Sequence, residues 1–161
     1  MYSKNGINGK ALLGKRAEDL SNLIEEQSQP IFDSLGIIVP IKSCSTLLSL
    51  FELQQASVTD LARQLDQSHQ LVKQKLPKLL KLEVIQQSPD KEDKRRTLYS
   101  LTPEGLVQSK KIKEYLKQSE KLVNSISQDI GVDIFDAIDN AIKAIKERSL
   151  LERFQAEKKD S

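Results

Sequence analysis

Apolar residues recur at helical spacing along most of this chain. Between residues 10 and 35 they fall at every third or fourth position, which predicts one long helix. Pro30 should kink or break that helix because proline lacks a backbone N–H, and Gly36 is a natural end for it. A second, shorter helix is predicted over residues 43–54, after a connector in which Pro40 disfavours helix.

Two further helices are predicted close together in the middle of the chain. Ser57 and Asp60 have the spacing of a capping box, in which the hydroxyl and the carboxylate bond to free backbone N–H groups, and they open the first of these helices. After a short turn, Ser68 is a suitable N-cap for the second helix, whose apolar residues share one face. Two short helices joined by a tight turn make a helix-turn-helix candidate.

Two β-prone segments follow, residues 84–88 and 97–101, with a charged loop between them. They predict a hairpin that is too small to form the core of a sheet protein and has the size of a wing beside the helix-turn-helix. Thr102 then caps a helix in which Pro103 takes the first position, where its missing N–H costs nothing.

The last third of the chain predicts two long amphipathic helices, residues 103–130 and 133–156, which Gly131 separates. The expected fold class is therefore mainly α with a small β-hairpin wing, a winged helix-turn-helix flanked by N- and C-terminal dimerisation helices. The isoleucine- and leucine-rich stripes of the terminal helices exceed what one helical layer on a small domain could cover. Self-association as a two-fold homodimer is the economical solution.

The charge of the chain is almost balanced, with 25 basic and 23 acidic side chains, but its distribution is uneven. Residues 68–100 contain eight lysines or arginines and four acids, which gives this segment a net charge of +4 and leaves −2 for the remainder. Positive charge gathered beside a helix-turn-helix is what a site for a polyanion requires.

Several classes of function find no support in the sequence. No glycine-rich phosphate loop, HExxH, CxxC or acid–base pair beside a nucleophile is present, so we expect no enzyme and no cofactor. His69 is the only histidine, which excludes a metal site built from several histidines. No apolar stretch approaches the ~20 residues of a membrane-spanning helix. A single cysteine forms no internal disulfide, so we expect a cytoplasmic protein without membrane contact.

The segment from residue 57 to residue 105 resembles the winged-helix core of the MarR (multiple antibiotic resistance regulator) family of bacterial transcription factors. The matching residues lie in the two motif helices, in the wing and at the start of the next helix. They are Leu61-Ala62, Ser68, Asp93-x-Arg95, and Leu101-Thr102 followed by Gly105.

The resemblance implies three parts: a dimerisation helix at residues 10–38, a DNA-binding domain at residues 39–103, and dimerisation helices at residues 104–157. It also implies a sequence-specific transcriptional regulator, a homodimeric repressor that binds a palindromic operator in double-stranded DNA. Many members release DNA when a small molecule binds, often an aromatic one. A similar effector is therefore expected here.

The resemblance also places the second motif helix in a major groove and the wing in the adjacent minor groove. The outward face of that helix supplies the expected recognition residues, which are Ser68, His69, Gln70, Lys73 and Gln74. His69 fits a phosphate contact or a plain surface position equally well. On the wing, Arg95 is expected to enter the narrow minor groove, with Asp93 pairing with it and orienting it. Lys94 and Arg96 are expected to contact phosphates.

The chain departs from the family pattern at three positions. Asp66 and Glu83 stand where the family usually has glycine, and Pro77 lies inside the expected recognition helix. These departures leave a second interpretation open, in which the winged helix has lost operator binding and serves as a protein-interaction or assembly module.

Cys44 raises the question of redox sensing, since one branch of the MarR family senses peroxides through a cysteine. In that branch the cysteine lies in the first helix, whereas Cys44 lies near the second. Lys42 is the only cation close to it in sequence, and a reactive thiolate needs positive charge nearby. We therefore expect Cys44 to be a small packing residue.

Overall fold

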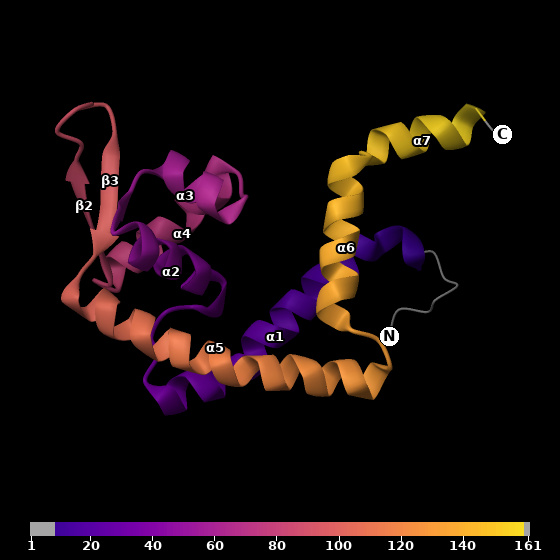
Figure 1. Cartoon of the computed structure of the whole chain (residues 1–161), viewed down its shortest axis with the longest axis horizontal. Helices are drawn as coiled ribbons and strands as arrows, with labels where there is room; N and C mark the ends of the chain where they lie inside the picture. Colours follow the sequence, from indigo (N-terminus) through magenta and orange to yellow (C-terminus); the bar gives the residue numbers. More distant parts are fainter. Residues whose placement is uncertain (1–8, 160–161) are drawn as a thin grey trace. The chain divides into compact units, whose positions relative to one another are not determined.

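The computed structural model describes residues 9–159, which form seven α-helices and one small antiparallel sheet (Figure 1). The chain divides into two compact units, one up to Lys113 and one from Glu114 onward, and each is described by itself. Among the described residues, no helix has the length and apolar character needed to pass through a bilayer. The expectation of a mainly helical chain with a small β wing is confirmed.

The first long helix, α1 (Leu13–Leu35), follows a short 3-10 turn and ends where the sequence predicted. Gly36 has a φ of 62°, and the next N–H, that of Ile37, bonds to the Phe32 carbonyl at 2.9 Å. This left-handed turn closes the helix at low steric cost because glycine has no Cβ. The predicted break at Pro30 is wrong. The proline is exposed, so water can satisfy the carbonyl that loses its N–H partner, and the helix continues.

Three helices pack together to form the head of the first unit: α2 (Cys44–Leu53), α3 (Val58–Leu65) and α4 (His69–Lys81). The predicted capping box at Ser57 and the predicted cap at Ser68 are both present. Side chains from all three helices form the apolar core of the head. The fully or almost fully buried ones are Leu47, Leu50, Leu61, Val72, Leu76 and Leu79.

The predicted hairpin is confirmed, as β2 (Ile85–Pro89) paired with β3 (Thr97–Leu101). A third strand that the sequence did not predict, β1 (Gln55–Ala56), pairs with the other edge of β3, so the order is β1-β3-β2. Two residues are too short to show an alternating pattern, which is why this strand escapes sequence analysis.

The next helix, α5 (Pro103–Ile130), begins directly after β3 with the predicted threonine cap. The Thr102 hydroxyl accepts from the Gly105 N–H at 3.0 Å and donates to the Glu83 carbonyl at 2.6 Å. One side chain therefore starts the helix and fixes it to Glu83, two residues before β2.

The three departures from the MarR pattern leave the backbone of the head in place. Asp66 and Glu83 adopt φ values of 52° and 56°, the left-handed conformation that glycine adopts without strain. Helix α4 continues through Pro77, whose ring lies on the exposed side. The steric cost falls on individual residues, and the turn between the motif helices still forms.

In the second unit, the helix predicted over residues 133–156 is two helices, α6 (Ile134–Glu147) and α7 (Leu150–Lys159). The cause of the break is a local signal that the apolar pattern obscured. The Ser149 N–H and hydroxyl donate to the Glu152 carboxylate at 2.7 and 2.8 Å, and the Glu152 N–H donates back to the Ser149 hydroxyl at 3.2 Å. This capping box starts a new helix.

Candidate nucleic-acid interface

Helix α4 has one buried face and one exposed face, as the sequence predicted. Its apolar face packs into the head, and the opposite face is exposed at every expected recognition position. These positions are Ser68, His69, Gln70, Lys73 and Gln74. The structure brings them onto one surface, and their contacts with DNA remain a prediction.

The start of α4 is suited to an anion. The Ser68 hydroxyl accepts from the Leu71 N–H at 3.2 Å, and His69 and Gln70 follow in the first turn. Unpaired backbone N–H groups and the helix dipole favour negative charge at this end. A phosphate beside this turn would therefore meet both side-chain and backbone donors, one turn before Lys73 and Gln74.

Lys75 differs from the other lysines of this helix, because it lies against the turn of the motif. Its ammonium donates to the Gln67 side-chain carbonyl at 3.0 Å. Partial burial lowers the pKa of Lys75 below its ordinary value. Lys75 adds to the charge of the segment but belongs to the internal structure of the helix-turn-helix.

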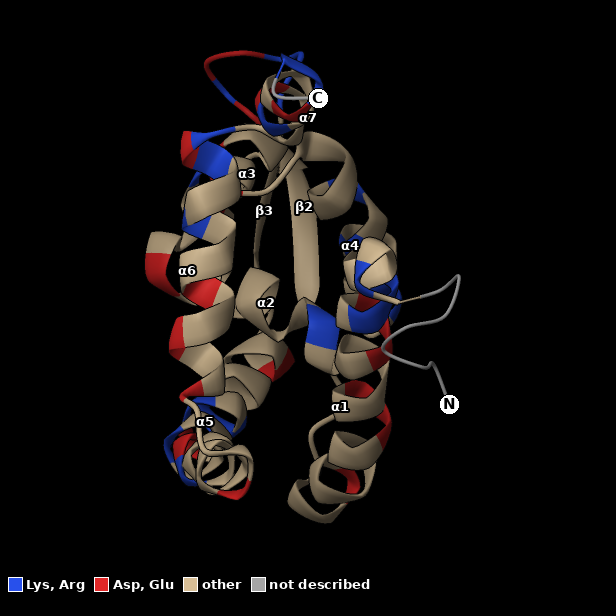
Figure 2. Ribbon diagram, turned by 90° about the vertical axis from the view of Figure 1, so that its right-hand side faces the viewer, with Lys and Arg blue, Asp and Glu red and all other residues tan. Residues whose placement is uncertain are grey.

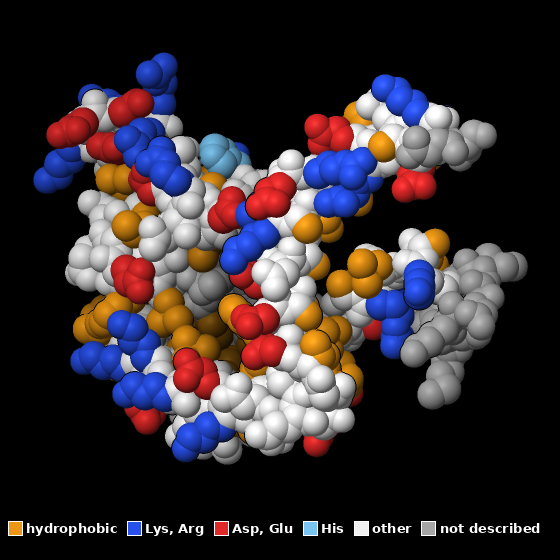
Figure 3. Space-filling view, turned by 45° about the vertical axis from the view of Figure 1, so that its right-hand side comes forward, with side chains coloured by type: hydrophobic (Ala, Val, Ile, Leu, Met, Phe, Trp, Pro, Cys, Tyr) orange, Lys and Arg blue, Asp and Glu red, His pale blue; other side chains and the backbone are white. Residues whose placement is uncertain are grey.

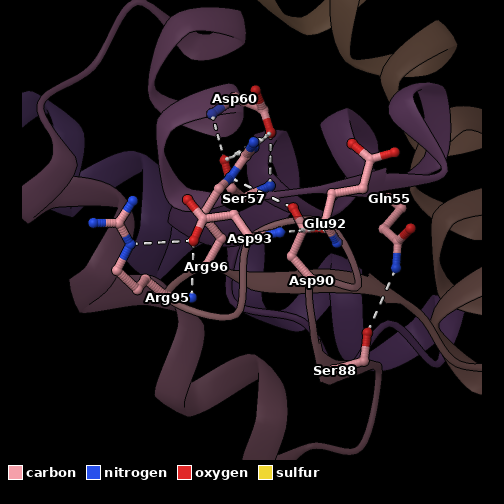
Figure 4. Close-up of polar contacts among 9 residues, drawn as sticks. All are labelled: Gln55, Ser57, Asp60, Ser88, Asp90, Glu92, Asp93, Arg95 and Arg96. Atoms are coloured by element: carbon pink, nitrogen blue, oxygen red, sulfur yellow. Dashed lines mark hydrogen bonds and ion pairs between the residues drawn. The ribbon is translucent and has the colours of Figure 1, made fainter.

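The wing loop between β2 and β3 is an ordered turn that its own aspartates build (Figure 4). One oxygen of the Asp90 carboxylate accepts from the Glu92 N–H at 2.9 Å and the Asp93 N–H at 3.4 Å. The Asp90 N–H bonds to the Arg96 carbonyl at 3.0 Å and closes the loop. Such Asx turns hold a tight bend without glycine.

Asp93 and Arg95 are paired, which is the geometry that the proposed orienting role requires. The Asp93 carboxylate accepts from the Arg95 backbone N–H at 3.0 Å and from its side-chain Nε at 3.3 Å. The Arg95 side chain is nevertheless 92% exposed. Its guanidinium therefore projects into solvent from a fixed base, and Lys94 beside it is also exposed.

Arg96 points in another direction, toward α3 (Figure 4). Its Nη2 donates to the Ser57 hydroxyl and to the Asp60 carboxylate, both at 3.1 Å. Its Nε lies 3.7 Å from the second oxygen of Asp90. The hydrogen bonds from Ser57, and then the charge of Arg96, hold the pKa of Asp60 below its ordinary value.

The sequence places Asp90 in the charged loop without giving it a role there, and it gives Ser57 and Asp60 no connection with the wing. The spacing of Asp90 to the two N–H groups that follow is a recognisable Asx-turn signal. The contact of Arg96 with Ser57 and Asp60 spans 39 and 36 residues, and no local pattern predicts it.

Charges of both signs gather at the tip of the wing, as Figures 2 and 3 show. Residues 90–96 contain four cations and three carboxylates. The cationic side chains differ in solvent exposure, because the carboxylates form ion pairs with some of them and leave others exposed. The local excess of positive charge is therefore carried by the exposed side chains, Lys91, Lys94 and Arg95.

Cys44 lies in the core of the head, 7% exposed, and its thiol donates to the Pro40 carbonyl at 3.5 Å. Burial raises the pKa of the thiol to about 12, so almost no thiolate exists at neutral pH. This environment suits a packing residue. Among residues 9–159, no group of three or more His, Cys, Asp or Glu side chains is arranged to hold a metal ion.

Comparison with known proteins agrees with this geometry. The family model "Winged helix DNA-binding domain" matches residues 46–105, which contain most of α2, both motif helices and the wing. A solved structure of a MarR mutant from E. coli with operator DNA is 15% identical, with a TM-score of 0.66 over 88% of this chain and 99% of that one. The chain therefore has a winged-helix fold like that of MarR.

Other MarR-type structures give the same result. BpsR from Bordetella bronchiseptica is 17% identical, with a TM-score of 0.61 over 92% of this chain and 97% of that one. The adhesin competence repressor AdcR from Streptococcus pyogenes is 20% identical, with a TM-score of 0.54 over 84% of this chain and 96% of that one. At these identities the likeness shows the fold. No curated protein sequence matches the chain.

Proposed function

We propose that this MarR-type chain is a sequence-specific, double-stranded-DNA-binding regulator of transcription that acts as a homodimeric repressor. The observation that carries the proposal is the placement of Arg95. Its side chain is 92% exposed and is held by Asp93, beside a helix whose outward face is polar and basic. A protruding, oriented arginine suits the narrow minor groove next to a major groove that α4 would occupy.

In this proposal some of the polar residues contact base edges and others contact phosphates. Lys73, Gln70 and Gln74 would meet base edges, since lysine reaches guanine acceptors and glutamine pairs with adenine. Lys94 and the first turn of α4, with Ser68 and His69, would meet phosphates, which set position and carry no sequence information.

The alternative function, a protein-interaction module without operator binding, depended on the three departures from the family pattern. Asp66 and Glu83 keep the conformation of the glycines that they replace, and α4 passes through Pro77 unbroken. The backbone of the helix-turn-helix is therefore intact despite these departures. This supports DNA binding over the alternative.

The remaining features of the proposal concern assembly and control. The terminal helices, residues 10–38 and 104–157, would join two chains and present two heads to a palindromic operator. A MarR structure contains operator DNA, and DNA binding by BpsR is regulated by 6-hydroxynicotinic acid. By analogy, a small aromatic effector would lower the DNA affinity of this chain.

Selection of bound fragments from genomic DNA, followed by a salt titration, tests the proposal. The logarithm of the binding constant should fall with the logarithm of salt concentration by about 0.9 per phosphate neutralised. Replacing Arg95 by Ala should weaken binding to the selected duplex severalfold, because the minor-groove contact is lost. Lys110→Ala removes one positive charge from an exposed position on α5 and should leave binding near that of the wild type.

Two results would count against the proposal. Wild-type protein that selects no fragment and binds no duplex at low ionic strength would remove DNA binding altogether. An Arg95→Ala variant with full affinity for the selected duplex would remove the wing from the interface.

A further inference from the structure

The two neighbouring arginines of the wing occupy different environments. The Arg95 side chain is 92% exposed, and among residues 9–159 its ion pair is with Asp93 of its own loop. The Arg96 side chain is 46% exposed and reaches the start of α3. Adjacent residues of the same type are therefore engaged in two different tasks.

Arg96 joins the wing loop to the start of α3. Ser57 follows directly after β1 and caps α3, Asp60 completes that cap, and Asp90 begins the wing loop. The guanidinium of Arg96 contacts all three, at 3.1, 3.1 and 3.7 Å. Because a guanidinium is a rigid, planar fork of donors, these contacts fix its direction as well as its distance.

The charges around Arg96 are unfavourable for a phosphate contact. Asp60 and Asp90 place two carboxylates on one guanidinium, so these three side chains carry a net charge of −1. A phosphate would have to compete with both carboxylates for the same donors, and it would be repelled by them. Arg95, with one carboxylate and almost full exposure, carries no such excess of negative charge.

The backbone connects this anchor to Arg95. The Arg96 N–H donates to the Asp93 carbonyl at 2.9 Å, and the Asp93 carboxylate holds both the N–H and the Nε of Arg95. Movement of Arg96 would therefore move the Asp93–Arg95 turn. Fixing Arg96 to α3 fixes the height and direction at which Arg95 leaves the wing.

We propose that Arg96 is a positioning residue, which docks the wing onto the cap of α3 through Ser57, Asp60 and Asp90 so that Arg95 meets the DNA in a set geometry. This inference rests on the DNA-binding function proposed above. It replaces the sequence-based interpretation of Arg96 as a phosphate contact, and it gives the acidic Asp60 and Asp90 a part in binding a polyanion.

Replacing an acid by its amide changes DNA affinity in opposite directions for the two possible roles of Arg96, a phosphate contact and a positioning residue. Removing a negative charge near bound DNA should strengthen binding by simple electrostatics. Under the proposal, Asp60→Asn weakens binding to the selected duplex by about threefold or more, because the anchor loses its charged partner. Glu92→Gln is the matched control. It removes an exposed charge from the same loop and should leave affinity unchanged or slightly increased.

A charge-preserving change gives a second, independent test, which avoids the cap of α3. Lysine can replace arginine at a phosphate contact but has no planar fork, with which Arg96 reaches Ser57 and Asp60 through Nη2 and Asp90 through Nε. Under the proposal, Arg96→Lys loses affinity almost as Arg96→Gln does. In an Arg95→Ala background, Arg96→Gln has little further effect, since the two residues act through one contact.

The measurement is fluorescence anisotropy of the full-length chain with a labelled duplex recovered by the genomic selection, and with a scrambled duplex of equal length. Thermal unfolding of each variant checks that the head is folded. If Asp60→Asn fails to fold, the Arg96→Lys and double-variant results decide.

The outcomes separate failure of this inference from failure of the proposed function. Wild-type protein that binds neither duplex contradicts the DNA-binding function itself. The positioning role is overturned if the wild-type protein binds the duplex and three further results are found. Asp60→Asn would bind more tightly, Arg96→Lys would keep full affinity, and the losses from Arg96→Gln and Arg95→Ala would add. Together these results would show that Arg96 contacts a phosphate.

Discussion

At Gly105 the fold leaves no room for a side chain. This residue lies in the first turn of α5, and a Cβ placed on it would come 1.8 Å from the carbonyl oxygen of Val84, at the start of the wing. Because the obstacle is backbone, no side-chain rotation can relieve it. The glycine that follows Leu101-Thr102 in the MarR pattern therefore has a steric explanation in this chain.

Gly105→Ala should lower the free energy of unfolding by about 3 kcal/mol or more, because α5 and β2 must separate to admit the methyl group. Gly14→Ala is the matched control. No heavy atom lies within 4 Å of a Cβ at that helical position, and alanine favours helix over glycine by up to about 1 kcal/mol. Urea unfolding followed by circular dichroism measures both. Equal stabilities for the two variants would contradict the steric account.

Single residues also show what a family pattern predicts and what it leaves open. The pattern correctly marked residues 66 and 83 as unusual, and both have positive φ values. It could not show that aspartate and glutamate would adopt that conformation. The strain of a left-handed L-residue is about 1–2 kcal/mol, which the packing of a whole head can offset. The shape of the backbone depends on the balance between this strain and the packing energy of the whole head. That balance cannot be read from any single position of the sequence.

At the scale of elements, one buried amide joins the end of α1 to the start of α5. Gln108 is 2% exposed, and its side chain donates to the Gly36 carbonyl at 3.2 Å and accepts from the Ile38 N–H at 3.0 Å. Lys111 donates to the same Gly36 carbonyl at 2.9 Å. These contacts satisfy the backbone groups of the turn that leads from α1 into the head.

Gln108→Leu should therefore destabilise the protein by about 1–3 kcal/mol, because the Ile38 N–H loses its acceptor and the Gly36 carbonyl loses one of its donors while the volume changes little. Gln118→Leu, at an exposed position further along α5, should stay within about 0.5 kcal/mol of the wild type. Both are compared by urea unfolding at one fixed protein concentration. A Gln108→Leu variant as stable as the control would show that water satisfies Ile38.

Elements governed by local signals were predictable, and those governed by distant contacts were not. The Gly36 end of α1, the Ser57 and Ser68 caps and the Thr102 start of α5 each depend on a few adjacent residues, and all were predicted. The recognition face followed from helical periodicity. The short strand β1 and the Arg96 contact to α3 depend on chain segments that meet only after folding. The break before α7 was local, but the regular apolar pattern on both sides concealed it.

At the scale of the whole molecule, the second unit leaves many large apolar side chains exposed. No residue of α6 or α7, all of which the structure describes, is buried. Phe135, Ile138, Ile142 and Ile145 follow one another at spacings of three and four, so they form a single exposed stripe along α6. A contiguous stripe of this kind marks an association surface.

A homodimer would cover this surface and would supply the paired heads of our proposed function. In light scattering at micromolar concentration, the wild-type protein should have twice the mass of one chain. The double substitution Ile138→Glu with Ile142→Glu should shift it toward the monomer, because a two-fold interface would bring four new carboxylates together. Asn140→Glu adds charge on the opposite face of α6 and should remain dimeric.

Dimerisation should also govern DNA binding, because two linked heads bind two half-sites with a high effective concentration. The double variant should lose most of its affinity for the selected duplex but keep weak binding by single heads, while Asn140→Glu keeps full affinity. Half-sites in the selected fragments should lie about 34–36 Å apart or at multiples of that spacing. Two results would contradict this prediction: a wild-type protein that stays monomeric, or a monomeric variant that binds DNA as tightly as the wild type. Either result would show that a single head accounts for all of the DNA binding.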